Sequence, residues 1–267
     1  MDIQILGGFA ARLDRTEIVP TAPKPRQVLA LLAVNAGRLV PASLLVEELW
    51  GSRPPRSART TLQTYVLRLR ELIDAALDQA PGGGPRSSKD VLVTRAGGYL
   101  LEPGDGTVDF RTFDRLSTEG YQAMEAGDHA GAGRLLHAAL ALWTGPALVD
   151  VDRGRHLDVQ ARRLEEARLC ALDRRIEVDL ILGRHRELLP ELTVLVHQHH
   201  LNESLCGQFM LALYRAGRAG EALSVYQRLR AALVRDLGLE PSASVQRLQQ
   251  SILGAPTQAA RELQPVH

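Results

Sequence analysis

The sequence predicts a mainly α protein with a small β component, in which a winged helix-turn-helix precedes an all-α, tetratricopeptide-like helical repeat domain. Three observations predict this fold class. Short strand patterns enclose three helix patterns in the first 101 residues, and strand patterns almost vanish after residue 106. Two turn glycines, Gly183 and Gly217, stand 34 residues apart, the period of the tetratricopeptide repeat. We therefore expect domains at residues 1–103 and 104–254, and a flexible tail over 255–267.

The beginning of the first domain predicts a small sheet followed by two helices. Residues 1–19 alternate apolar residues with turn residues, which is typical of short antiparallel strands. Prolines then interrupt the pattern, and residues 26–34 form the first predicted helix. The second helix ends at Gly51, and the hydroxyl of Ser43 is its expected N-cap because it can accept a hydrogen bond from an unpaired amide.

A third helix is predicted from an N-cap at Ser57 to about residue 77. Its apolar residues recur at intervals of four, three and four positions, on one face: Leu62, Val66, Leu69 and Ile73. At 100° per residue, three polar side chains fall roughly opposite: Thr60, Thr64 and Arg68. The two stripes are cleanly separated.

A loop and a β-hairpin complete the predicted winged helix. Residues 80–90, rich in glycine and proline, predict a flexible loop. Residues 91–95 and 99–101 flank the turn at 96–98 and predict the two strands of the hairpin.

The second predicted domain repeats a helix, a glycine turn and a helix. Its turns are at Gly127, Gly183 and Gly217, and a helix around residues 156–168 interrupts the regular spacing. At least three helix pairs of this kind can bury a continuous core and present a surface to another protein.

The third helix is the best candidate for a functional site. A helix that enters the DNA major groove needs one face on its own core and donors on the other. Thr60, Thr64 and Arg68 suit contacts with bases, and Arg59 and Arg70 can reach phosphates from the flanks. A solvated amphipathic helix would show the same stripes, so the hairpin that follows is the feature that favours DNA binding.

The hairpin carries its own cations. Arg95 lies near the predicted tip, where it could enter the minor groove, and Lys89 could contact a phosphate at the base. Residues 1–101 hold 13 Lys and Arg against 9 Asp and Glu, a net charge of +4, whereas the remainder carries −3. A charge of +4 is modest for DNA binding, so we expect help from a second protomer or a partner.

Other classes of protein receive little support. The longest apolar run, residues 28–34, is far shorter than the ~18 residues of a membrane span, and no secretory signal opens the chain. Two cysteines, Cys170 and Cys206, predict neither a disulfide framework nor a metal site. We therefore expect a cytoplasmic, nucleoid-associated protein without a membrane partner.

No catalytic or cofactor motif stands out. His197, His199 and His200 lie close in sequence, but no thiolate or second cluster accompanies them, so a polar helix end is the preferred interpretation. The chain lacks a phosphate-binding loop and a serine-nucleophile elbow. We expect no cofactor, no metal and no enzymatic activity, although an enzyme with scattered catalytic residues or a repeat-containing adaptor would remain compatible with the sequence.

Several segments, in order, resemble one family of bacterial regulators. They are residues 25–32 (PRQVLALL), 44–51 (LLVEELWG), 57–70 (SARTTLQTYVLRLR), 92–99 (LVTRAGGY), 110–113 (FRTF), 139–143 (ALALW) and 228–241. The first four resemble the winged-helix domain of the Streptomyces antibiotic regulatory protein family, and the others its bacterial transcriptional activation domain. The resemblance extends over about residues 1–254.

This resemblance implies a function. Members of the family are pathway-specific activators that bind direct repeats upstream of biosynthetic genes, usually as two protomers side by side. They recruit RNA polymerase holoenzyme through its sigma factor and alpha subunits. By analogy the chain would activate a secondary-metabolite (antibiotic) gene cluster. Without a receiver domain it would be controlled chiefly through its concentration. Repression remains the alternative because binding alone does not decide the sign.

The resemblance also implies roles for individual residues. Arg68 matches the recognition-helix arginine that faces bases, Arg70 matches a backbone contact and Arg95 matches the arginine of the wing. Thr60, Thr64 and Tyr65 occupy positions that vary among relatives, and Leu67 stands where response regulators often have a basic residue. The full expected DNA-binding set is Arg59, Thr60, Thr64, Tyr65, Arg68, Arg70, Lys89, Thr94 and Arg95.

Overall fold

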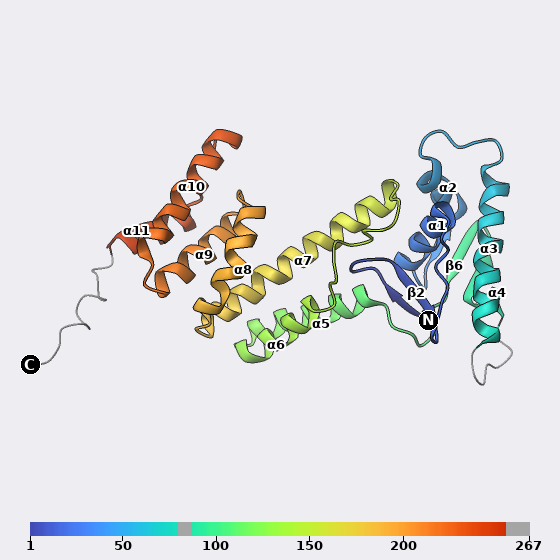
Figure 1. The fold of residues 1–267 in the computed structure, drawn as a ribbon, viewed down its shortest axis with the longest axis horizontal. Coiled ribbons are helices and arrows are strands. Elements are labelled where there is room, and N and C mark those ends of the chain that lie inside the picture. Colours follow the sequence, from blue (N-terminus) through green and yellow to red (C-terminus); the bar gives the residue numbers. More distant parts are fainter. Residues whose placement is uncertain (80–86, 255–267) are drawn as a thin grey trace, which may run out of the picture. The chain divides into compact units, whose positions relative to one another are not determined.

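The computed structural model describes residues 1–79 and 87–254, so the predicted tail at 255–267 lies outside the described residues (Figure 1). The chain forms two compact units. The first contains residues 1–118 and 137–170, and the second contains residues 119–136 and the described residues from 171 onward. Residues 104–118 and 137–170 therefore pack together with the first 103 residues.

Two small antiparallel sheets belong to the first unit. The N-terminal sheet has the order β1-β2-β3 and confirms the prediction for residues 1–19; its strands are β1 (Asp2–Gln4), β2 (Ala10–Leu13) and β3 (Thr16–Glu17). The second sheet has the order β4-β6-β5; its strands are β4 (Leu39–Pro41), β5 (Leu92–Arg95) and β6 (Gly98–Leu101). The predicted hairpin is thus confirmed, and we call residues 92–101 the wing. Strand β4 was not predicted, because three residues become a strand only through pairing with β6.

The first unit also contains three helices and a short fourth one (Figure 1); they are α1 (Pro23–Val34), α2 (Ala42–Trp50), α3 (Ala58–Asp78) and α4 (Ser88–Val91). Helix α1 is buried over most of its surface, and α3 packs on α1, α2 and β2. The order of sheet, three helices and hairpin confirms the predicted winged helix-turn-helix.

Several predicted helix boundaries were wrong. Helix α1 begins at Pro23 rather than at residue 26, because a proline in the first turn removes an amide that has no helical partner anyway. Ser43 does not cap α2: the helix starts at Ala42, whose amide donates to the carbonyl of Gly97 in the wing at 2.8 Å. Ser57 does occupy the N-cap position of α3, but its side chain makes no capping hydrogen bond.

The predicted loop over 80–90 is also shorter than expected. Residues 80–86 lie outside the described residues, but Ser88 begins α4. Ser87 and Asp90 form a reciprocal capping box, in which the amide of Ser87 donates to the Asp90 carboxylate at 2.8 Å. The amide and hydroxyl of Ser88 donate to Asp74 of α3 at 2.8 and 2.7 Å. These contacts attach α4 to α3 and stabilise a helical turn that the loop composition did not predict.

Two aspartates join the N-terminal sheet to later residues of the first unit. The Asp109 carboxylate accepts hydrogen bonds from the amides of Ile5 and Leu6 at 2.7 and 2.9 Å. Burial raises the pKa of Asp109 above its ordinary value, while the amide hydrogen bonds act in the opposite direction. Asp150 accepts a hydrogen bond from the amide of Phe9 at 2.7 Å and pairs with Arg26.

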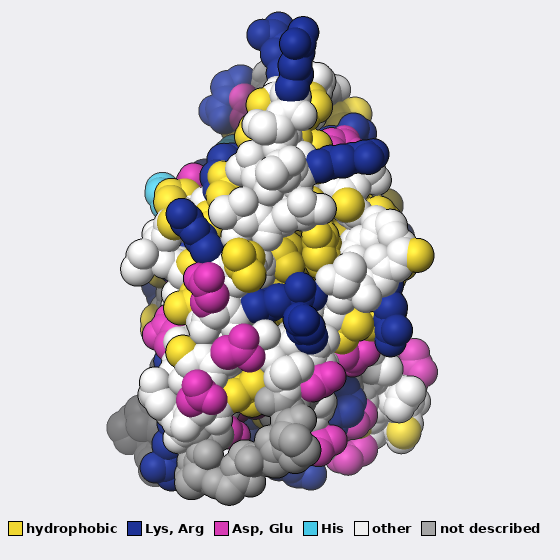
Figure 2. Space-filling model, turned by 90° about the vertical axis from the view of Figure 1, so that its right-hand side faces the viewer, with side chains coloured by type: hydrophobic (Ala, Val, Ile, Leu, Met, Phe, Trp, Pro, Cys, Tyr) yellow, Lys and Arg dark blue, Asp and Glu magenta, His cyan; other side chains and the backbone are white. Residues whose placement is uncertain are grey.

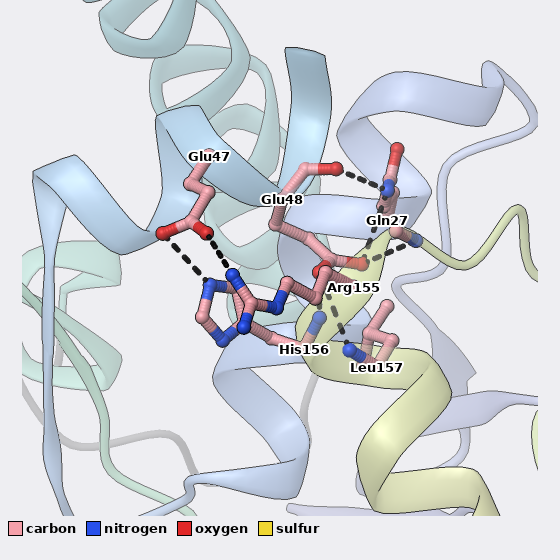
Figure 3. A network of polar contacts seen from close by, with 7 residues as sticks. Gln27, Glu47, Glu48, Arg155, His156 and Leu157 are labelled. Carbon is pink, nitrogen blue, oxygen red and sulfur yellow. Dashed lines mark hydrogen bonds and ion pairs between the residues drawn. The ribbon is translucent and has the colours of Figure 1, made fainter. Parts of the chain in front are cut away.

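A buried glutamate on α2 makes a third connection, to the start of α7 (Arg155–Ile181) (Figure 3). Glu48 is 3% exposed. Its carboxylate accepts hydrogen bonds from the amides of Gly154, His156 and Leu157 at 2.6, 2.7 and 3.2 Å. Gln27 of α1 donates to the same carboxylate at 3.2 Å and to the Glu48 carbonyl at 3.0 Å. One side chain therefore fixes the beginning of α7 on the helix that precedes α3.

The remaining helices confirm the predicted repeat. They are α5 (Asp109–Glu125), α6 (His129–Leu140), α8 (His185–Gln198), α9 (Glu203–Arg215), α10 (Ala219–Leu237) and α11 (Ala243–Gly254). Gly127, Gly183 and Gly217 each have φ near +80°, between α5 and α6, α7 and α8, and α9 and α10. The separate helix predicted around residues 156–168 was wrong, because these residues continue without a break into α7.

Candidate nucleic-acid interface

Helix α3 has one buried and one exposed face, as its periodicity predicts. Its apolar stripe is at most 2% exposed and consists of Leu62, Val66, Leu69 and Ile73. Thr60 and Thr64 are exposed on the other side. The Thr64 hydroxyl donates to the Thr60 carbonyl at 3.1 Å, so its oxygen is left as an acceptor for an approaching amine.

Two arginines of α3 extend from this surface without an internal partner. Arg59 and Arg68 are exposed, and neither side chain makes a hydrogen bond or ion pair with any residue that the structure describes. Arg95 at the wing turn and Lys89 on α4 are also exposed, and their side chains make no hydrogen bond or ion pair with a residue that the structure describes. These cations can therefore pair with phosphates or base edges without first breaking a contact in the protein.

Arg70 differs from these residues because its guanidinium binds the wing. Its Nη2 atom donates to the Leu92 carbonyl at 2.7 Å and to the Thr94 hydroxyl at 2.8 Å, and its Nε atom donates to the same carbonyl at 3.2 Å. Arg70 and Thr94, both expected to contact DNA, are thus hydrogen-bonded to each other. This arrangement positions β5 against α3, and with it the turn that carries Arg95.

We expect Arg70→Ala to weaken DNA binding by loosening the wing. Losing these charge-assisted bonds should lower the free energy of unfolding by about 1–3 kcal/mol. The salt dependence of the affinity separates this role from a direct phosphate contact. A lost phosphate contact reduces the slope of log K against log salt concentration by about 1, whereas a positioning residue leaves it nearly unchanged. An Arg70→Ala slope reduced by a full unit, with unchanged stability, would contradict the positioning role.

Tyr65 is half-buried and packs against α2 rather than standing clear of the surface. Its ring stacks on Trp50, with centroids 6.5 Å apart and planes inclined by 20°. A groove of about 640 Å³ lies between α2, the N-terminal part of α3 and the turn of the wing. Arg59, Gly97 and Tyr99 are among its lining residues. The wing approaches β4 closely, since a Cβ on Gly98 would lie 2.2 Å from the Val40 carbonyl oxygen.

Charge is unevenly distributed over this face. Figure 2 looks onto the side where α3 lies in Figure 1, and shows Lys and Arg mostly in the upper and central part and Asp and Glu mostly in the lower part. Along α3 the basic residues come first, at 59, 68 and 70, and the acidic residues last, at 71, 74 and 78. A polyanion is therefore attracted to the N-terminal two thirds of α3 and repelled by its end.

Two cations near this surface were not predicted from the sequence. Arg53 and Arg56 are exposed in the connection between α2 and α3. The available signal was their position on either side of Pro54 and Pro55, which restrict the backbone immediately before the candidate helix. They add positive charge near the N-terminal end of α3, the end that already attracts a polyanion.

The described part of the chain holds neither a candidate metal site nor a helix that could span a membrane. Within residues 1–79 and 87–254, no group of three or more His, Cys, Asp or Glu side chains could hold a metal ion. No helix in these ranges is long and apolar enough to cross a bilayer.

Comparisons with known proteins match both halves of the chain to regulatory families. Residues 16–101 match the model of "transcriptional regulatory protein, C terminal", and residues 108–253 match that of the "bacterial transcriptional activator domain". Regulatory protein DnrI of Streptomyces peucetius is 49% identical over 255 residues, which cover 96% of this chain and 93% of DnrI. Transcriptional regulator RedD of Streptomyces coelicolor is 36% identical, with 95% and 70% covered.

A solved structure shows the same fold. Mycobacterium tuberculosis EmbR, determined in complex with a low-affinity phosphopeptide, has a TM-score of 0.84 and 32% identity to this chain. The match covers all of this chain but 66% of EmbR, slightly less than two thirds of that protein. Regulatory protein AfsR of Streptomyces griseus is 37% identical to this chain. The match covers 96% of this chain but 25% of AfsR, which is therefore a much longer protein.

Proposed function

The chain belongs to the Streptomyces antibiotic regulatory protein family of transcriptional regulators, and from this premise we propose that it is a sequence-specific activator of a secondary-metabolite gene cluster. It binds direct repeats upstream of its promoters and recruits RNA polymerase. Two protomers occupy the repeats side by side on the chromosome in the cytoplasm.

One observation carries the DNA-binding part of this proposal. The exposed face of α3 presents Thr60, Thr64 and Arg68, and both Arg68 and the wing residue Arg95 lack a partner among the described residues. A helix of 21 residues with one apolar face on its own core can lie in the major groove while the adjacent wing reaches the minor groove. Arg59 and Lys89 then contact phosphates on either side.

In this proposal the two predicted domains have different functions. Residues 1–103 bind the DNA, and residues 104–254 offer a helical surface to the sigma factor and alpha subunits of the polymerase. The short connections through Glu48, Asp109 and Asp150 support a fixed attachment of the first part of the helical domain to the DNA-binding helices. A bound protomer would then present residues 137–170 in a defined orientation to the transcription machinery.

A gel-shift titration tests the DNA-binding proposal. Purified protein is titrated against the promoter regions nearest its own gene, with random duplex as competitor and at several salt concentrations. We expect retention on one promoter against excess competitor, with an affinity that falls as salt rises. Equal binding to the promoter and to random duplex would contradict sequence-specific recognition.

Transcription in vitro tests recruitment. With RNA polymerase holoenzyme on the retained promoter, we expect added protein to increase the number of transcripts. A decrease would identify a repressor instead. Retention on DNA without any change in transcript number would contradict recruitment but not DNA binding.

Arg68→Ala should weaken binding to the preferred duplex by about 5- to 150-fold and relax the choice of sequence, if Arg68 makes a bidentate contact with a base. Affinities for the preferred and the random duplex are compared for the variant and the wild type. Arg15→Ala is the matched control, because it removes the same charge from an exposed position between β2 and β3. Equal losses on both duplexes would instead make Arg68 a phosphate contact.

A further inference from the structure

Leu67 is an apolar side chain in the middle of the surface that faces the DNA in the proposed function. It is 57% exposed, in contrast to the buried leucines of α3. At 100° per residue, Leu67 lies only about 20° around the helix from Thr60 and about 60° from Thr64. Leu67 and Arg68 therefore lie on either side of Thr60 and Thr64 on the exposed face.

The surroundings of Leu67 decide which ligand it suits. A single exposed leucine is ordinary on a protein surface and needs no explanation. Here, however, the neighbours on the N-terminal side are the polar Gln63 and Thr64, and the adjacent Arg68 has no partner among the described residues, whereas the exposed carboxylate of Glu71 follows one turn later. The surface attracts a polyanion, and Leu67 is the large apolar group on it. Bound DNA would remove this side chain from water and would have to provide an apolar partner.

The major groove offers one apolar group on its base edges, the C5-methyl of thymine. An aliphatic side chain such as leucine can contact this methyl, whereas it cannot satisfy the donors and acceptors of a G·C pair. A basic side chain at this position would prefer guanine instead. Compared with a basic residue, leucine at position 67 therefore favours a different base pair at one position of the site. It does not simply remove a contact with guanine.

We propose that Leu67 is a specificity-determining residue that contacts a thymine methyl group in the major groove and selects a T·A pair at one position of each repeat. This inference rests on the proposed function. The thymine is expected next to the base contacted by Arg68, because the two residues are adjacent in sequence. Thr64, whose hydroxyl proton is engaged by the helix, can accept a hydrogen bond from an adenine or cytosine amine nearby.

Replacement of thymidine by deoxyuridine tests this proposal because it deletes only the methyl group. A preferred sequence is first selected with wild-type protein from a pool of random duplexes. Each thymidine is then replaced in turn, and the affinity of each duplex is measured for the wild type and for Leu67→Ala. We expect the wild type to lose about fourfold at one position in each repeat, the equivalent of one methyl group removed from an apolar contact. Leu67→Ala should bind both duplexes equally at that position.

Leu72→Ala is the matched control. Leu72 is also an exposed leucine of α3, 36% exposed, but it lies about 140° around the helix from Leu67. This variant should keep the wild-type response to deoxyuridine at every position. Alanine is the best helix former, so both variants should fold, and circular dichroism verifies this.

The outcomes separate this inference from the proposed function. An enriched sequence whose binding tolerates deoxyuridine everywhere would overturn the role of Leu67 alone. So would a Leu67→Ala protein that keeps the wild-type loss at every thymidine. Failure to enrich any sequence would overturn sequence-specific binding and the role of Leu67 together.

Discussion

Replacing Glu48 with alanine is expected to lower the free energy of unfolding by about 3–5 kcal/mol. The carboxylate accepts hydrogen bonds from three amides at the start of α7 and one from Gln27. Alanine would leave these donors without an acceptor in a site where Glu48 itself is 3% exposed. It would also remove the negative charge at the positive end of the dipole of α7.

The chain segments approach closely around this carboxylate. A Cβ on Gly154 would lie 2.2 Å from the Glu48 carbonyl oxygen. Urea denaturation of the full chain measures the loss. In thermal denaturation we expect a fall of about 10 °C in Tm for a unit of this size. Glu48→Gln keeps an acceptor but turns an amide group toward amide donors, so it should lose an intermediate amount.

The neighbouring Glu47 provides the control (Figure 3). Its side chain is 44% exposed and pairs with Arg155 and His156 at 3.5 and 3.2 Å. Because solvent screens exposed pairs, Glu47→Ala should cost less than about 1 kcal/mol. Equal effects of the two alanine variants would contradict the proposed importance of the buried carboxylate.

The second large effect is expected for Asp179→Ala in the helical repeat unit. Asp179 is 2% exposed and pairs with Arg175 and Arg184 at 3.3 and 3.0 Å. Arg175 is 5% exposed and also pairs with Glu191. Removing the aspartate leaves a buried guanidinium with one less carboxylate, which typically costs about 3–5 kcal/mol.

Glu177→Ala is the control for this variant. Glu177 lies on the same helix and pairs with Arg174 at 2.9 Å, but both side chains are about half exposed. We expect it to cost less than about 1 kcal/mol in urea denaturation. If Asp179→Ala unfolds at the same urea concentration as Glu177→Ala, the buried cluster does not stabilise the helices as inferred.

The periodic elements were predictable because their patterns are local. The spacing of Leu62, Val66 and Leu69 predicted both the existence of α3 and its buried face, and the structure has both. The turns at Gly183 and Gly217 were also predictable, because both glycines have positive φ angles that other residues rarely adopt. The boundaries were less predictable, because the start of α2 depends on an amide bonded to the wing rather than on Ser43.

The candidate site was predictable as a set of exposed cations but not as an arrangement. Helical spacing places Arg68 opposite the buried stripe and Arg70 on its flank, but it does not show which group Arg70 binds. The structure leaves Arg68 exposed and binds Arg70 to Leu92 and Thr94, 22 and 24 residues further along the chain. In the sequence, Leu67 is notable only because response regulators often have a basic residue at this position. The structure shows it as an exposed apolar side chain on the face that carries Thr60 and Thr64.

The sequence by itself determined the periodic helices, the hairpin, the faces of α3 and the family to which the chain belongs. These depend on spacings of three or four residues and on short motifs in order. Only the tertiary structure decided which charges are used inside the protein. Glu48 and Gly154 are 106 residues apart, and their contact exists because folding brings α2 to the start of α7. A buried carboxylate must find hydrogen-bond donors wherever the fold supplies them, and no local pattern encodes such a partner.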